Sequence, residues 1–441
     1  MAHPNRNIQW LDGELNRWAG QGIISNIQAE AIRRLYPPSP AARPWALIVF
    51  SGFGAGIIGL GVILLFAYNW HYIPKFGKLG IIFAAIAIAH GIGLWLFLRT
   101  ERFRTLGEAI TVLGTMLFGA GIWLVAQIYN ISEHYPTAFL FWGLGALALA
   151  WAMPSVAQAI MAAVLFTIWA ATESIEFARA MHFAIPAVIL LWPLAYMKRS
   201  RVLLGVLILS FGFSASFVTS AYAEENLVIY VLLSVAALYV ALGLLGRQYT
   251  KFPQAAPVFN TFGLAAYFVM LYLLTSPEVA HGLLSAGPGL KTETVVYGVL
   301  PLLVALAAWL PVVWPFLPWC AKPRPLHYHY EFLLIPLTLI LFCGYVLLPT
   351  GIERWQMTVP CNLVFLAYAV TMMARGCRQA QLWPTILGSL MLVALTVARF
   401  TDLFESLVVR GLVFIVLGAI LFCEGILYIR FKKKQVAMGT K

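Results

Sequence analysis

Hydrophobic segments recur from Pro44 to Phe431, and only short polar connections separate them. A helix of about 20 apolar residues is long enough to cross the hydrocarbon core of a bilayer. Inside that core every backbone N–H and C=O must be bonded within the protein, which favours helices over open strands. The pattern therefore predicts an all-α fold, a polytopic transmembrane helical bundle.

Fourteen windows of the chain satisfy this criterion. Their approximate limits are 45–70, 79–98, 109–130, 137–153, 156–174, 184–197, 202–223, 227–246, 254–276, 295–319, 332–350, 359–376, 382–404 and 410–431. The pair of spans around Pro154 and the short sixth span also fit a re-entrant segment or two half-helices. An error there would change the number of spans but not the orientation of the ends.

The first 43 residues follow a different pattern, which is typical of a small soluble hairpin. One helix would gain an apolar face from residues spaced three or four apart, namely Ile8, Leu11, Leu15 and Trp18. After a break at Gly20 to Gly22, Ser25 and Gln28 match a capping box that begins a second helix. We expect an amphipathic helical hairpin and linker over 1–43, serving either as a local anchor or as a regulatory, protein-binding element.

The distribution of positive charge predicts the side of the membrane on which each end lies. Of the 29 Lys and Arg residues, 22 fall in segments on the same side as the N-terminus, and 7 fall on the other side. Because positive residues are retained in the cytoplasm, we place both termini there. The predicted organisation is a cytoplasmic hairpin at 1–43, a transmembrane helical domain at 44–431 and a basic cytoplasmic tail at 432–441.

Composition narrows the function classes. With 61% hydrophobic and 10% charged residues, the chain does not resemble an ordinary soluble domain. Its formal charge of +12 is spread over short loops, so we expect contacts with membrane lipids and no nucleic acid. The five cysteines contain no C-x-x-C pair, and His327, His329 and Glu331 have no further ligand obviously nearby except Cys320. We expect no metal, no cofactor and no disulfide framework.

Polar residues close the first and third spans on the predicted outer face. The candidate substrate-binding residues are Asn69, Trp70, His71, Gln127, Tyr129 and Asn130, with Tyr72, Glu133 and His134 close by in the sequence. Topology brings both groups to one membrane surface. Two interpretations remain open: an aromatic belt at the interface, or a polar cavity that opens to the outside and binds an anionic or hydroxyl-rich headgroup.

Ionisable residues inside apolar spans are costly and need a partner or a wet cavity. Arg399 and Asp402 are three residues apart and form a candidate gating or structural ion pair. Glu424 lies inside the last span, where it would either snorkel or pair with a neighbouring helix, or act in gating or proton coupling. His90 lies near the middle of the second span, where it would be either a proton-sensitive group or, as we expect, a histidine that is hydrogen-bonded within the bundle.

Several stretches resemble a known family. The segments Glu14 to Ile32, Leu60 to Trp70 and Ala126 to Ile131 together resemble the bacterial domain of unknown function 2157 family, and Arg399 to Phe404 with Arg410 to Phe414 look like the end of its longer members. The resemblance implies a multi-span protein of the bacterial inner membrane with an N-terminal helical hairpin. It implies no activity and no catalytic residue.

The leading hypothesis is a transporter, or a protein that handles lipids or envelope precursors, with a small polar or lipid-linked substrate. The alternative is a non-catalytic membrane scaffold or sensor that docks a cytoplasmic protein partner through the hairpin. An integral membrane transferase is a third reading, with His71 or His134 as the general base. No P-loop, G-x-S-x-G or H-E-x-x-H motif is present, which favours a protein that is not an enzyme.

Overall fold

The structure is a computed structural model of the whole chain. It describes residues 4–35, 73–99, 101–131, 134–222, 227–249, 252–280, 294–313, 330–347, 353–379 and 381–399, together with isolated positions at 292 and between 415 and 430. Every regular element in these residues is helical, which agrees with the predicted all-α fold. The chain divides into two compact units, 1–80 and 81–441.

The first unit contains the predicted hairpin. Helix α1 runs from Pro4 to Gly20 and α2 from Asn26 to Leu35. Leu15 and Ala29 are buried, as the amphipathic pattern requires. Gly22 has a φ of 70°, a conformation that glycine adopts without strain at a turn. The capping box is confirmed, since the Ser25 and Gln28 side chains each accept a hydrogen bond from the other residue's backbone N–H.

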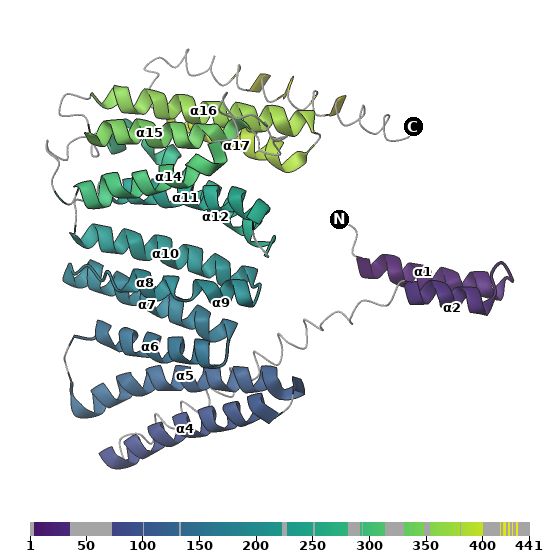
Figure 1. Cartoon of the computed structure of the whole chain (residues 1–441), viewed down its shortest axis with the longest axis vertical. Coiled ribbons are helices and arrows are strands. Elements are labelled where there is room, and N and C mark those ends of the chain that lie inside the picture. Colours follow the sequence, from purple (N-terminus) through teal and green to yellow (C-terminus); the bar gives the residue numbers. More distant parts are fainter. Residues whose placement is uncertain are drawn as a thin grey trace. The chain divides into compact units, whose positions relative to one another are not determined.

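The second unit is a set of roughly parallel and antiparallel helices that lie beside one another in an order close to that of the chain (Figure 1). After α4 (Lys75–Arg99), which begins at the boundary between the units, the α-helices are α5 (Glu101–Tyr129), α6 (Pro136–Ala152), α7 (Val156–Phe177), α8 (Ala184–Ile189), α9 (Trp192–Met197), α10 (Arg201–Tyr222), α11 (Leu227–Tyr249), α12 (Ala255–Leu274), α14 (Leu300–Val313), α15 (Leu334–Leu347), α16 (Arg354–Arg378) and α17 (Leu382–Arg399). A π-helical turn, η2 (Thr294–Val299), leads into α14, and a 3-10 turn, η4 (Tyr330–Leu333), leads into α15.

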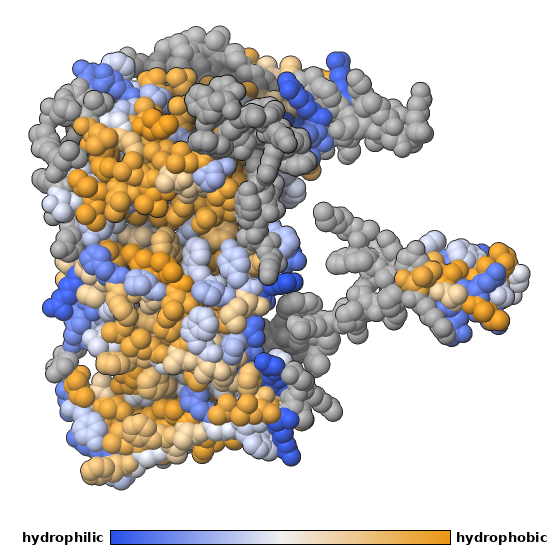
Figure 2. All heavy atoms as spheres, in the orientation of Figure 1, coloured by the Kyte–Doolittle hydropathy of each residue, from blue (hydrophilic) through white to orange (hydrophobic). Residues whose placement is uncertain are grey.

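Among the described residues, eight helices are long and apolar enough to cross a membrane. Four shorter apolar helices lie at 136–152, 184–197, 334–347 and 382–398. Hydrophobic side chains cover the middles of the helices and hydrophilic ones gather near the helix ends (Figure 2). The windows at 45–70 and 410–431 lie wholly or largely outside the described residues, so the number of fourteen spans stays a prediction.

Two apolar clusters hold the second unit together. The first cluster contains residues of α6, α7, α8, α9 and α10, together with parts of α11 and α12. The second cluster contains residues of α11, α12, α14, α15, α16 and α17. Tyr297 packs against both clusters. Helix α11 is central to the bundle, with 67% of its apolar window buried, whereas only 17% of the window of α4 is buried. Much of the apolar surface of α4 is therefore free to face lipid.

The sixth predicted span contains two short helices, α8 and α9, with a break at Leu190 and Leu191. This agrees with the two half-helices that the sequence left open. Pro193 explains the break, because it has no N–H to donate to the carbonyl four residues earlier. Leu191 and Leu194 are fully buried, so the broken segment is part of the core.

Glycines bring α4, α5 and α6 close together. A Cβ on Gly107 would lie 2.5 Å from the backbone nitrogen of Phe97, and one on Gly119 would overlap the ring of Trp142. Gly119 therefore allows close contact between α5 and α6. His90 packs against Gly114 and hydrogen-bonds its backbone, as expected for a histidine within a bundle.

Candidate ligand pocket

A pocket of about 860 Å³ lies between α4, α5, α6 and the connection from α5 to α6. Its volume is in the range of sites that bind small molecules. The residues with polar side-chain groups in its lining are Trp123, Gln127, Asn130, His134, Tyr135 and Thr137. Phe83 and Phe141 line it and are more than half exposed, so the pocket opens to the outside of the bundle.

Polar and apolar groups occupy different levels of the pocket. Apart from the indole of Trp123, the polar side chains come from residues 127–137, at the end of α5 and the beginning of α6. Phe118 on α5, Ile86 on α4 and Phe141 on α6 line it further from these helix ends. Phe118 is nine residues from Gln127, which corresponds to about 13 Å along a helix. The pocket is shaped for a ligand with a polar head and an apolar body.

Asn130 occupies its position because it ends α5. Its φ of 51° is left-handed, a conformation that asparagine tolerates better than most residues. Its N–H donates to the Gln127 carbonyl and the N–H of Ile131 donates to that of Ala126, the pattern of a Schellman cap. The asparagine therefore has a structural role in its backbone, while its side chain lines the pocket.

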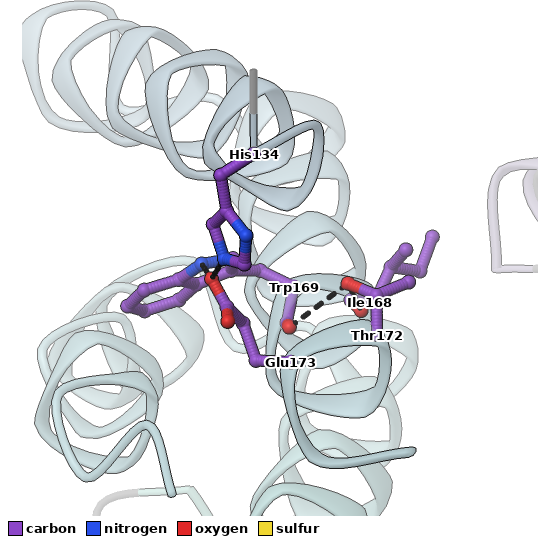
Figure 3. A network of polar contacts seen from close by, with 5 residues as sticks. All are labelled: His134, Ile168, Trp169, Thr172 and Glu173. Atoms are coloured by element: carbon purple, nitrogen blue, oxygen red, sulfur yellow. Dashed lines mark hydrogen bonds and ion pairs between the residues drawn. The ribbon is translucent and has the colours of Figure 1, made fainter. Parts of the chain in front are cut away.

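His134 connects the pocket to a buried carboxylate. Its Nε2 lies 2.7 Å from Oε1 of Glu173 on α7, and the indole Nε1 of Trp169 donates to the same oxygen at 3.3 Å (Figure 3). The Glu173 side chain is 4% exposed and that of His134 is 27% exposed. The second carboxylate oxygen of Glu173, Oε2, is buried and has no hydrogen-bond partner among the described residues.

A second acid lies one turn further along α7. Glu176 hydrogen-bonds the phenol of Tyr135, and this bond is the main reason that the pKa of Tyr135 is raised above its ordinary value. Burial and the negative charges of Glu176 and Glu173 raise it further. The connection from α5 to α6 is thus held to the end of α7 by two side-chain pairs that both involve carboxylates.

The opposite end of α7 has a separate polar network. The hydroxyl of Ser155 caps α7 by accepting from the N–H of Gln158, and it donates to Glu108 on α5 at 2.5 Å. The amide of Gln158 donates to the Thr115 hydroxyl at 2.9 Å, and Thr115 donates to the carbonyl of Thr111. These bonds fix α7 against α5 at the end remote from the pocket.

The predicted site residues have different outcomes. Gln127 and Asn130 both line the pocket, together with His134. Tyr129 is 43% exposed and does not line it. The remaining candidates lie outside the described residues, or have side chains outside them: Asn69, Trp70, His71, Arg399, Asp402, Glu424 and the metal-ligand stretch His327 to Glu331. Their roles, including the ion pair and the gating role, stay predictions.

Sequence reasoning did not single out Glu173, Trp169 and Glu108. A signal was present, because carboxylates within apolar segments are rare and need partners. Both acids lie near helix ends, where a charged residue is readily assigned to the neighbouring loop.

The fold and the pocket define a multi-pass helical membrane protein with a ligand-sized cavity near the ends of three helices. Residues 16–159 match the family of predicted membrane proteins known as DUF2157, which confirms the resemblance found in the leader and first spans. The matched region includes the second helix of the hairpin and the whole pocket lining. No curated protein and no solved structure matched the chain.

Proposed function

We propose that the protein binds an amphiphilic ligand in the pocket between α4, α5 and α6, as a transporter or as a handler of lipids or envelope precursors. The observation that carries the proposal is the pocket, with polar groups near the helix ends and aromatic and aliphatic walls further in. Such a lining suits a polar headgroup at the membrane surface and an acyl or prenyl chain among the helices. Under the predicted topology this surface is the outer face of the inner membrane.

Gln127 and Asn130 supply the polar contacts in this proposal. Each carboxamide offers two N–H donors and one carbonyl acceptor, which suits a hydroxyl-rich or phosphate-containing head. Helix α4, whose apolar window is mostly unburied, forms one wall with Ile82, Phe83 and Ile86. A chain lying against this wall would reach the pocket directly from the bilayer.

Native mass spectrometry of the protein released from lipid nanodiscs tests this proposal. We expect a retained small molecule or lipid in the wild type and its loss in Gln127→Ala. Ala138→Trp, which places a large side chain in the pocket lining, should have the same effect. Gln379→Ala is the matched control, because Gln379 is exposed at the end of α16. Equal retention in all four proteins would overturn the proposal.

The scaffold function is the second candidate, and exposed apolar residues on the hairpin favour it. Trp10 is 63% exposed and Ile27 is 82% exposed, although both belong to amphipathic helices. Such residues can form the centre of a protein interface. Deleting residues 1–40 separates the two candidates: a scaffold loses its partner and its phenotype, whereas a ligand-binding protein keeps its retained ligand.

A further inference from the structure

The pair of His134 and Glu173 differs from the other polar contacts of the pocket because it contains a buried charge. In its less protonated state a neutral imidazole donates Nε2–H to the carboxylate, and the pair has a net charge of −1. One added proton gives an imidazolium beside the carboxylate, with no net charge. Since the Glu173 side chain is almost fully buried, removing the net charge relieves a large desolvation penalty.

The position of Glu173 on its helix also favours the protonated pair, which has no net charge. Glu173 lies in the second-last turn of α7, and its own backbone carbonyl accepts the N–H groups of Ala178 and Arg179 that end the helix. The C-terminal end of a helix has a partial negative charge, which disfavours an anion and favours a cation. Among the described residues, no Lys or Arg side chain forms an ion pair with Glu173, so His134 is the group placed to supply the positive charge.

The other ionisable groups around the pair are few. On α7 and the connection before α6, Glu176 and Tyr135 are bonded to each other. Tyr129 ends α5, Arg179 follows α7 and is exposed, and His182, before α8, is bonded to Tyr297. Helices α6 and α8, which pack against α7, contain no charged residue or histidine, and α10 contains none at this end. Glu133 lies outside the described residues.

We propose that His134 and Glu173 form a proton-binding site in the wall of the pocket, and that a proton is the coupling ion for its ligand. His134 lines the pocket and also bonds the buried carboxylate, so it connects the two events. The proton is taken up on the imidazole, after which Nε2–H donates to Glu173 and Nδ1–H becomes a donor for an acceptor group of the ligand. The coupling role rests on the proposed function, whereas the proton site does not.

Nitrogen-15 NMR of histidine in the full-length protein in nanodiscs tests the proton site without any ligand. His134→Gln identifies the His134 signal by its loss. We expect Glu173→Gln, which keeps the size of the side chain and removes its charge, to lower the ratio of imidazolium to imidazole at His134 at least about tenfold at a fixed pH. Glu176→Gln is the control and should change this ratio less than about twofold. An unchanged ratio in a folded Glu173→Gln protein would overturn the proton site.

Binding of a named probe, short-chain phosphatidylglycerol, tests the coupling role. We expect tighter binding at about pH 5.5 than at about pH 8, and loss of this difference in Glu173→Gln. Binding that is independent of pH in the wild type would overturn the coupling role and leave the proposed pocket standing. Absence of binding at both pH values would count against the proposed function and the coupling role together, while the NMR experiment still decides the proton site.

Discussion

The contact between α4 and α5 offers a sharp test of how the pocket is held together. These helices approach so closely at Gly107 that an added Cβ would lie 2.5 Å from the nitrogen and 2.9 Å from the Cα of Phe97, and 2.6 Å from the carbonyl oxygen of Gly93. All three atoms belong to the backbone, so a rotamer change cannot relieve the clash. In Gly107→Ala the helices must separate by about 0.9 Å to restore an ordinary contact of 3.4 Å.

Such overpacking typically destabilises a protein by about 1–3 kcal/mol. An SDS-unfolding titration of the purified protein measures this loss. Because α4 forms a wall of the pocket through Ile82 and Ile86, we also expect weaker ligand retention in native mass spectrometry. Gly91→Ala is the matched control: Gly91 lies on α4 with no atom within 4 Å of an added Cβ, and alanine favours the helix by up to about 1 kcal/mol. Equal stability of the two variants would refute the close packing of α4 on α5.

Three further predictions concern other contacts. Ser155→Ala removes the cap of α7 and the donor to Glu108, and should cost about 1–3 kcal/mol in the same titration, with Ser216→Ala on α10 as control. Because the pKa of Tyr135 is raised, its bond to Glu176 persists through the ordinary tyrosine pKa and is lost as pH rises through the raised value; the difference between ultraviolet titrations of the wild type and Tyr135→Phe should show a phenolate that forms above the ordinary tyrosine pKa. Leu15→Ala should speed hydrogen exchange across 4–35 in the full chain, whereas Ile27→Ala, at an exposed position, should not.

The sequence was sufficient for the features that depend on one helix at a time. Apolar length located the long helices, and the capping box at Ser25 and Gln28 located the start of α2. The break in the sixth span was expected only as one alternative, since a proline can either kink a helix or end it, and its neighbours decide which. Leu191 and Leu194 show that these neighbours are the core itself.

The pocket could be predicted only in part, because it depends on contacts between helices. Gln127 and Asn130 were identified because their polar side chains stand at the end of an apolar span. Glu173 is 39 residues from His134 in the sequence, and no periodicity connects them. Their pairing follows from the packing of α6 on α7, which a hydrophobicity pattern does not specify when every face of a helix is apolar.

The two acids near opposite ends of α7, the partly buried Glu108 and the buried Glu173, show why residue type alone does not define a role in such a bundle. Glu108 approaches the N-terminal end of α7, where the partial positive charge of the helix and the Ser155 hydroxyl both stabilise a carboxylate. Glu173 lies near the C-terminal end, where the helix disfavours an anion and the compensating charge must come from elsewhere. Glu108 is therefore a structural anchor between α5 and α7. In our proposal the positive charge beside Glu173 comes from His134, which places the responsive acid beside the pocket and the structural one away from it.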